Sequence, residues 1–175
     1  MATKNNGKQA EVIIQAALIH LEGKCPMTFQ RLYDSTSAGV GKGGNFLPAT
    51  PADFIAVFNH TTFLVEVKSS VVHKSLRDCE LRSTFSENQI MSARLWERAG
   101  AVPLAIFLSS DLSFEAWRMS TVVKAYLGEK GKRKLEGSPL TSFDSDKPSV
   151  INALQTLLAG LSHESLQQVK LTHQI

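Results

Sequence analysis

The run VPLAIFL at residues 102–108 constrains the fold most strongly, because none of its residues is polar. A strand that is apolar on both sides has to be covered on both sides, as in sheets that contain parallel strands flanked by helices. Amphipathic helices are predicted at 8–23 and 149–160, where apolar residues recur at helical spacing. The chain is therefore expected to be an α/β protein with a mixed central sheet flanked by helices.

The other segments supply more strands and two more helices. β-Branched and aromatic residues predict strands at 27–34, 53–58, 62–69 and 113–118. A helix is predicted from Ser86 to Arg98, because Gln89 completes a capping-box pattern with Ser86, and a short helix is predicted at 120–128. Polar or glycine-rich composition predicts irregular structure at 35–51, 71–84 and 128–148.

Length and composition indicate one domain in a reducing compartment. The 175 residues suffice for one core, expected at about 7–118 with a helical extension at 119–175. Cys25 and Cys79 stand far apart, which argues against a disulfide scaffold or a zinc site and favours the cytoplasm. We expect no secretory leader and no membrane-spanning segment. The net charge of +3 is compatible with a polyanionic partner.

Three charged residues stand in or beside the predicted strands 53–58 and 62–69. Asp53 opens the first strand, and Glu66 and Lys68 share one face of the second. If the two strands form a hairpin, Asp53 lies beside Glu66 and Lys68, and two carboxylates converge next to an amine. Such oxygen-rich clusters bind Mg²⁺, which stabilises the charge that builds on a phosphate under attack.

The pattern PAD…EVK, with twelve residues between Asp53 and Glu66, resembles the PD-(D/E)xK nuclease superfamily. The resemblance implies a restriction-endonuclease-like core with the order helix, three-stranded meander, helix, strand. It implies Mg²⁺ as cofactor, with Mn²⁺ as a substitute, held by Asp53, Glu66 and the Val67 carbonyl. Lys68 would then position the nucleophilic water, and Glu11 in the first helix would add a metal or water ligand.

Further segments are similar to archaeal-type Holliday junction resolvases and RecU-like resolvases. They are GKQAE before the first helix, STSAG at 35–39, FSENQIMSARLWERAGA at 85–101, and VPLAIFL. This likeness runs from about residue 7 to 118. It implies a homodimer that cuts four-way DNA junctions, in which Gln89 faces the site, and it implies no small-molecule cofactor.

Basic and hydroxyl side chains in the polar segments are candidates for contact with the DNA backbone. Lysine and arginine release counterions from DNA, and the run 124–137 is dense in both. The candidate DNA-binding residues are Ser35, Ser37, Lys42, His73, Lys74, Arg77, Lys130, Lys132, Arg133 and Lys134.

Each candidate also has a plain structural interpretation. Glu66 and Lys68 could form an exposed ion pair on an edge strand, and Asp53 could serve a turn. Glu11 could be a solvated first-turn acid, and Gln89 could serve the cap alone. Two other functions stay open: a restriction, homing or repair endonuclease of the same superfamily, and a catalytically idle DNA-binding protein of the same fold.

Overall fold

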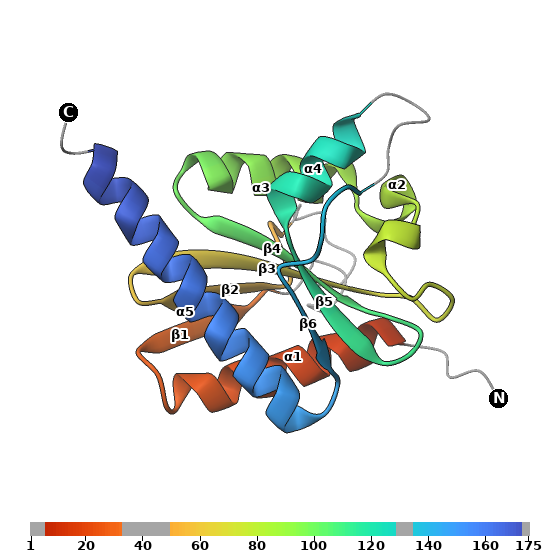
Figure 1. Ribbon diagram of the computed structural model, residues 1–175, viewed down its shortest axis with the longest axis horizontal. Helices are drawn as coiled ribbons and strands as arrows, with labels where there is room; N and C mark the ends of the chain where they lie inside the picture. Colours follow the sequence, from red (N-terminus) through yellow and green to blue (C-terminus); the bar gives the residue numbers. More distant parts are fainter. Residues whose placement is uncertain (1–5, 33–49, 129–134, 173–175) are drawn as a thin grey trace, which may run out of the picture.

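The computed structural model of the protein describes residues 6–32, 50–128 and 135–172. In these ranges six strands form one sheet in the order β1-β2-β3-β4-β5-β6 (Figure 1). Only β3 and β4 pair in parallel; the other neighbours are antiparallel. The strands are β1 (Met27–Arg31), β2 (Phe54–Phe58), β3 (Thr61–Ser69), β4 (Val102–Leu108), β5 (Ser113–Arg118) and β6 (Thr141–Asp144).

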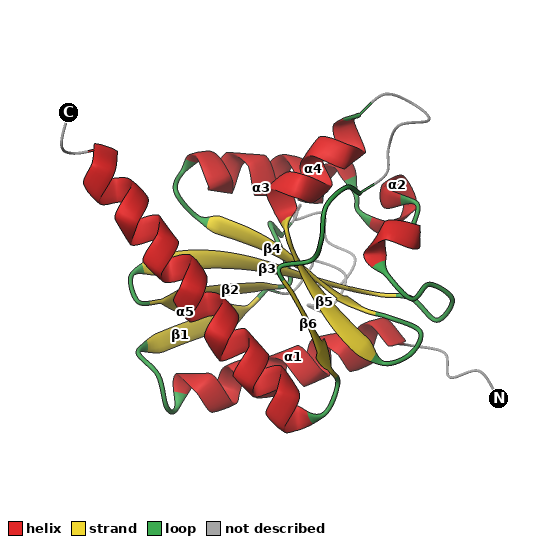
Figure 2. Cartoon of the chain, in the orientation of Figure 1, coloured by secondary structure: helices red, strands yellow, loops and turns green. Residues whose placement is uncertain are grey.

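Helices cover both faces of the sheet (Figure 2). One face packs against α1 (Asn6–Glu22) and α5 (Lys147–Thr172), and the other packs against α2 (Leu81–Thr84), α3 (Glu87–Arg98) and α4 (Met119–Leu127). A 3₁₀ turn, η1 (Leu76–Asp78), precedes α2. All residues of β4 are buried, as its apolar composition predicts. The predicted α/β fold and the order helix, three-stranded meander, helix, strand are confirmed.

A two-residue turn sets the register of the β2–β3 hairpin. Asn59 and His60 have φ values of 46° and 65°, the left-handed conformation that tight hairpin turns require. The turn makes Phe58 the partner of Thr61 and Phe54 the partner of Val65. The hairpin predicted from 53–58 and 62–69 is therefore confirmed, and its register brings the start of β2 to the middle of β3.

Several predictions are wrong in detail. The segment 71–84 contains η1 and α2, and 128–148 contains the strand β6. This edge strand escapes pattern recognition because it is short and half-exposed; its Phe143 stacks on Phe114 with ring centroids 5.4 Å apart. The helix predicted at 149–160 is confirmed, and it extends to Thr172, since the stretch after Gly160 contains no proline or glycine to end it.

The C-terminal helix α5 contributes to the main core. Val150, Leu154 and Leu158 are buried against the sheet and α1. The buried Ser162 hydroxyl donates a hydrogen bond of 3.1 Å to the carbonyl of Phe58, at the end of β2. The predicted core at 7–118 therefore lacks a helix that packs directly on it. No helix in the described ranges is long and apolar enough to cross a membrane.

Substitution of Leu154 or Leu158 by alanine should test this packing. Each variant should lose about 2–5 kcal/mol in free energy of unfolding, because a buried leucine leaves a cavity when truncated. The measurement is denaturant unfolding followed by circular dichroism. Thr156→Ala, an exposed position on the same helix, should leave stability nearly unchanged. If both leucine variants were as stable as the parent, the packing of α5 would contribute nothing to the stability of the core.

Candidate active site

The hairpin register places Asp53 beside Glu66 on neighbouring strands. Asp53 precedes Phe54, whose partner is Val65, so it lies opposite Glu66. Its Oδ2 accepts a hydrogen bond of 2.7 Å from the backbone N–H of Val67. Val65 and Val67 belong to the core on the α1 side, so Glu66 and Lys68 point to the face that α3 covers. The predicted convergence of Asp53 with Glu66 and Lys68 is present.

Glu66 is the buried centre of this cluster, with 4% of its surface exposed. Its Oε1 accepts from Lys68 Nζ at 2.7 Å and from Gln89 Nε2. Its Oε2 is buried and has no hydrogen-bond partner among the described residues. A buried carboxylate oxygen without a partner costs free energy, so this atom is the feature of the site that most needs a ligand. The alternative of an exposed ion pair on an edge strand does not describe Glu66.

Gln89 serves the helix cap and the site together. The Ser86 hydroxyl accepts from the Gln89 N–H, and Gln89 Oε1 accepts from the Ser86 N–H at 3.0 Å, which completes the predicted capping box. The same Oε1 accepts from Lys68 Nζ at 3.2 Å, while Nε2 donates to Glu66. The first turn of α3 is therefore tied directly to the charged pair on β3.

The environment of Glu66 favours its neutral form. Burial raises the pKa of Glu66 to about 7, and the negative charge of Asp53 adds to this effect. The ammonium of Lys68 acts in the opposite direction. Lys68 itself is held on its other side by the ring of Phe85, whose centroid lies 5.5 Å from Nζ. When Asp53 and Glu66 are both ionised, the cluster has two negative charges and Lys68 supplies one positive charge, so one negative charge is not balanced.

Glu11 lies at the margin of the cluster. It binds the Arg31 guanidinium, which also donates to Gln15 at 2.8 Å. Burial raises the pKa of Glu11, and the negative charge of Asp53 raises it further. The sequence analysis missed Arg31; the alternation in MTFQR places it with Phe29 and Met27 on the face toward α1, where a cation needs an acidic partner.

The described residues contain no group of three or more His, Cys, Asp or Glu side chains placed to hold a metal ion. The carboxylates of Asp53 and Glu66 form a pair, and Glu11 is engaged with Arg31. A small cavity of about 10 Å³ borders Glu66 and Gln89, with room for about one water molecule. The metal roles expected of Asp53, Glu66, Val67 and Glu11 stay predictions.

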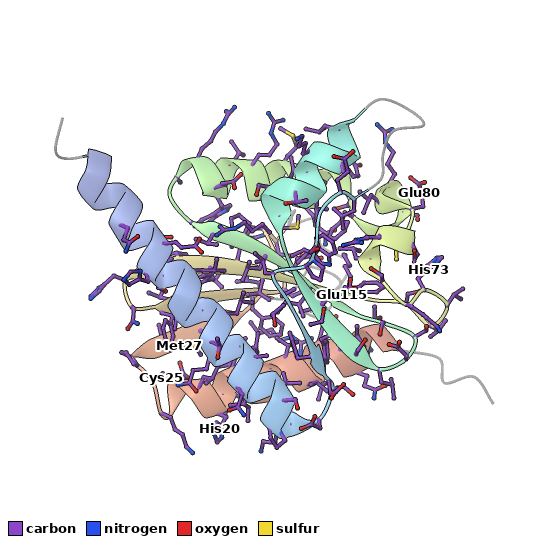
Figure 3. The ribbon with its side chains drawn as sticks, in the orientation of Figure 1. His20, Cys25, Met27, His73, Glu80 and Glu115 are labelled. Carbon is purple, nitrogen blue, oxygen red and sulfur yellow. The ribbon has the colours of Figure 1, made fainter. Side chains whose placement is uncertain are left out.

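Of the predicted DNA-binding residues, three lie in described ranges. His73 is partly exposed in the turn after β3 (Figure 3), and Lys74 is exposed beside it. Arg77 donates to the Gly137 carbonyl and lies 5.5 Å from the centroid of the Trp117 ring, so its guanidinium already has structural partners. The other seven lie outside the described residues: Ser35, Ser37, Lys42, Lys130, Lys132, Arg133 and Lys134.

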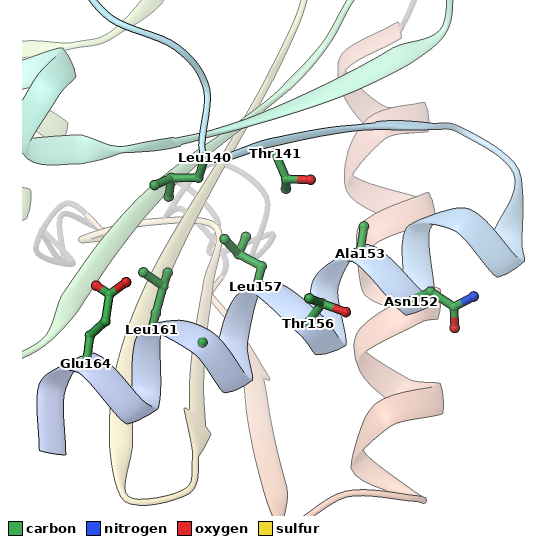
Figure 4. Close-up of a pocket in the computed structure, with 9 residues that line it drawn as sticks. Leu140, Thr141, Asn152, Ala153, Thr156, Leu157, Leu161 and Glu164 are labelled. Atoms are coloured by element: carbon green, nitrogen blue, oxygen red, sulfur yellow. The ribbon is translucent and has the colours of Figure 1, made fainter. Parts of the chain in front are cut away.

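A groove of about 470 Å³ lies elsewhere, between α5 and the start of β6 (Figure 4). Leu140, Thr141, Leu157 and Leu161 are among its lining residues, and Glu164 is the acidic residue in that lining. None of the site residues lines it. The groove is therefore separate from the Asp53 and Glu66 cluster.

No known protein family and no curated protein sequence matches the chain. Among solved structures it is similar to Hjc of Archaeoglobus fulgidus, a Holliday junction resolvase from an archaeal hyperthermophile. The identity is 15%, the TM-score is 0.40, and the match covers 66% of this chain and 79% of that chain.

The raised pKa of Glu66 predicts a pH-dependent stability in metal-free buffer. Between pH 4.5 and about 7 the folded chain binds more protons at this group than the unfolded chain, so stability falls as pH rises through this window. The contribution is on the order of 3 kcal/mol. Glu66→Gln should remove it, whereas Glu97→Gln, an exposed change on α3, should not. Denaturant unfolding across pH 4.5–8 is the measurement; parallel curves for the parent and Glu66→Gln would contradict the prediction.

Proposed function

We propose that the chain is a divalent-metal-dependent endodeoxyribonuclease that hydrolyses phosphodiester bonds in branched DNA, with the four-way junction as substrate. The observation that carries the proposal is the unpartnered Glu66 Oε2, buried beside a second carboxylate and a lysine. A purely structural ion pair would satisfy both carboxylate oxygens. One oxygen without a partner next to Asp53 is the arrangement expected of a cation site.

The residues fit Mg²⁺, with Mn²⁺ as a substitute. Mg²⁺ keeps several waters and is commonly held by one or two carboxylates together with substrate phosphate, so a third acidic ligand is not required. Asp53 and Glu66 would hold the ion, together with the Val67 carbonyl. When bound, the ion supplies charge neutralisation at the phosphate under attack.

Lys68 has the position to direct the nucleophile. Its ammonium is fixed by Glu66, Gln89 and the Phe85 ring, so it can donate a hydrogen bond to a water at a defined place. The same charge stabilises the negative charge that develops on the phosphate oxygens. Gln89 holds both partners through its two amide atoms and so acts as a positioning residue.

The choice of branched DNA and of a homodimer comes from the resemblance of the sequence to junction resolvases. A four-way junction requires two symmetric cuts, and a two-fold dimer provides two equivalent sites. The basic run at 124–137 would add backbone contacts that carry no sequence information. The cell compartment proposed for this activity is the cytoplasm.

A catalytically idle DNA-binding protein of the same fold is the second candidate. It is favoured by the pairing of Glu11 with Arg31, which withholds the third acid from the site, and by the pairing of Lys68 with Glu66. Cleavage assays with Mg²⁺ and Mn²⁺ on labelled four-way junction and matched linear duplex separate the two candidates.

Removal of either carboxylate should abolish cleavage and preserve binding. Asp53→Asn and Glu66→Gln take away negative charge, so contact with phosphate is not weakened. The parent should also gain thermal stability from millimolar Mg²⁺, because a ligand of the folded state stabilises it, and both variants should lose this gain. Glu97→Gln is the matched control and should behave as the parent. A variant that cleaves at the parental rate would show that the site is wrongly placed.

Lys68→Ala should slow single-turnover cleavage by about two orders of magnitude or more at saturating DNA, since it removes a group that acts on the reacting atoms. Affinity for the junction should change little. Lys24→Ala, at an exposed position after α1, provides a control with the same loss of charge. Circular dichroism of both variants excludes misfolding. Lost affinity with normal turnover would reduce Lys68 to a phosphate contact.

A further inference from the structure

Three exposed apolar side chains lie at the end of the sheet next to Lys68. Val71 and Val72, in the turn after β3, are 63% and 73% exposed, and Leu112, in the turn between β4 and β5, is 50% exposed. We call these three residues the apolar tip. Because β3 and β4 are parallel, their carboxyl ends meet at the same edge of the sheet, where Lys68 pairs with Phe107.

Hydrogen bonds fix both turns. The Ser70 hydroxyl accepts from the N–H groups of Val72 and His73, at 3.2 and 3.0 Å. The Ser70 N–H donates to Leu108 in β4, and the Ser110 N–H donates to the carbonyl of His73, at 3.0 and 2.9 Å. The two turns are therefore joined, and the valines project from a braced loop.

Leu112 is held in an unfavourable backbone conformation. Its φ is 65°, in the left-handed region that a leucine rarely adopts. The turn is held by Ser109 and Ser113, whose hydroxyls donate to the Asp111 carboxylate, and by the Leu112 N–H, which donates to Ser109. Glycine or asparagine would fit this conformation without strain and without an exposed apolar group. The fold therefore keeps a leucine here at a cost.

The position of the tip, close to Lys68, favours the nucleic acid of the proposed function as its partner. Val71 follows Lys68 by three residues, at most about 11 Å of chain, which corresponds to about three nucleotides along one DNA strand. His73 and Lys74 lie beside the valines and can contact phosphate. Two exposed acids also lie near Leu112: Asp111, whose carboxylate accepts from the two serine hydroxyls, and Asp144, the strand partner of Ser113.

The size of the tip argues against a protein partner. Three partly exposed side chains offer a few hundred Å² at most, below the roughly 800 Å² that each partner gives to a stable protein interface. Apolar side chains do enter DNA between base steps and unstack them, and unstacking costs less where a base is not held in a continuous duplex stack.

We infer that Val71, Val72 and Leu112 form a wedge that contacts unstacked bases at a DNA branch, within about three nucleotides of the bond that is cut. This inference rests on the proposed function and gives it a source of substrate selectivity. The wedge would favour branched over linear DNA because unstacking a base at a branch, where the duplex stack is interrupted, costs less than unstacking it within a continuous duplex.

The test uses the full chain with Asp53→Asn, which prevents cutting, and a four-way junction that carries 2-aminopurine at its centre. Binding should increase 2-aminopurine fluorescence, which reports unstacking. In the variant Val71→Ser, Val72→Ser, Leu112→Asn, most of this increase should be lost. The preference for junction over linear duplex should fall by about tenfold or more, because buried apolar contact is lost. Affinity for linear duplex should be unchanged.

The control variant Ile19→Ser, Leu95→Ser changes two residues that are 56% and 60% exposed on α1 and α3, and it should behave as the parent. Unchanged fluorescence and preference in the tip variant would overturn the inference. Equal loss of affinity for both DNAs would also overturn it, since the tip would then be a general contact. A change in oligomeric state on sedimentation, with DNA selectivity intact, would overturn it in favour of a protein interface.

Failure of the proposed function has a different signature. If the parent with Asp53 cleaves no DNA but its fluorescence response depends on the tip, the wedge is supported and the proposed nuclease activity is overturned. If the parent cleaves junctions and the tip variant retains the full selectivity, the nuclease activity is supported and the wedge is overturned. If the parent binds no DNA, both the nuclease activity and the wedge are overturned.

Discussion

Burial of an ionisable carboxylate at the centre of a β-sheet is the constraint on which the site depends. Glu66 lies on β3, between β2 and β4. Burial of a charged side chain at such a place lowers stability unless the charge is paired and hydrogen-bonded, whereas burial of an apolar side chain does not. Its position is tolerated because Lys68 and Gln89 donate to one of its oxygens. The other oxygen has no such donor. Stability is thus lower than the same sheet would have with an apolar residue here, which is characteristic of positions kept for chemistry.

The helix cap and the site share one residue, and this links fold and chemistry. The capping box begins α3 at Glu87 and thereby fixes where Gln89 lies relative to β3. A shift of the helix by one residue would rotate the amide away from Glu66, since successive residues differ by about 100° around a helix axis. The position of Lys68 therefore depends on local hydrogen bonds at the start of a helix as much as on the strand that carries it.

The sequence predicts those features that its apolar pattern and turn chemistry determine. The run at 102–108, the capping box at Ser86 and the hairpin with Asp53 beside Glu66 all follow from local rules and are present. The strand β6 does not follow, because it is short and half-exposed, and its pairing with β5 and the stacking of Phe143 on Phe114 join residues that lie far apart in sequence. The pairing of Arg31 with Glu11 depends on how α1 lies across β1, which no local pattern specifies.

The packing of α5 beside α1 has a consequence for how the chain folds during synthesis. Both helices cover the same face of the sheet, so the apolar surface around Ile14 and Leu18 is complete only after Val150 and Leu154 have left the ribosome. At 5–20 residues per second this interval lasts on the order of ten seconds. Throughout it, a chaperone can bind the uncovered face. A chain truncated before Leu154 would leave that face exposed permanently and become a substrate for proteolysis.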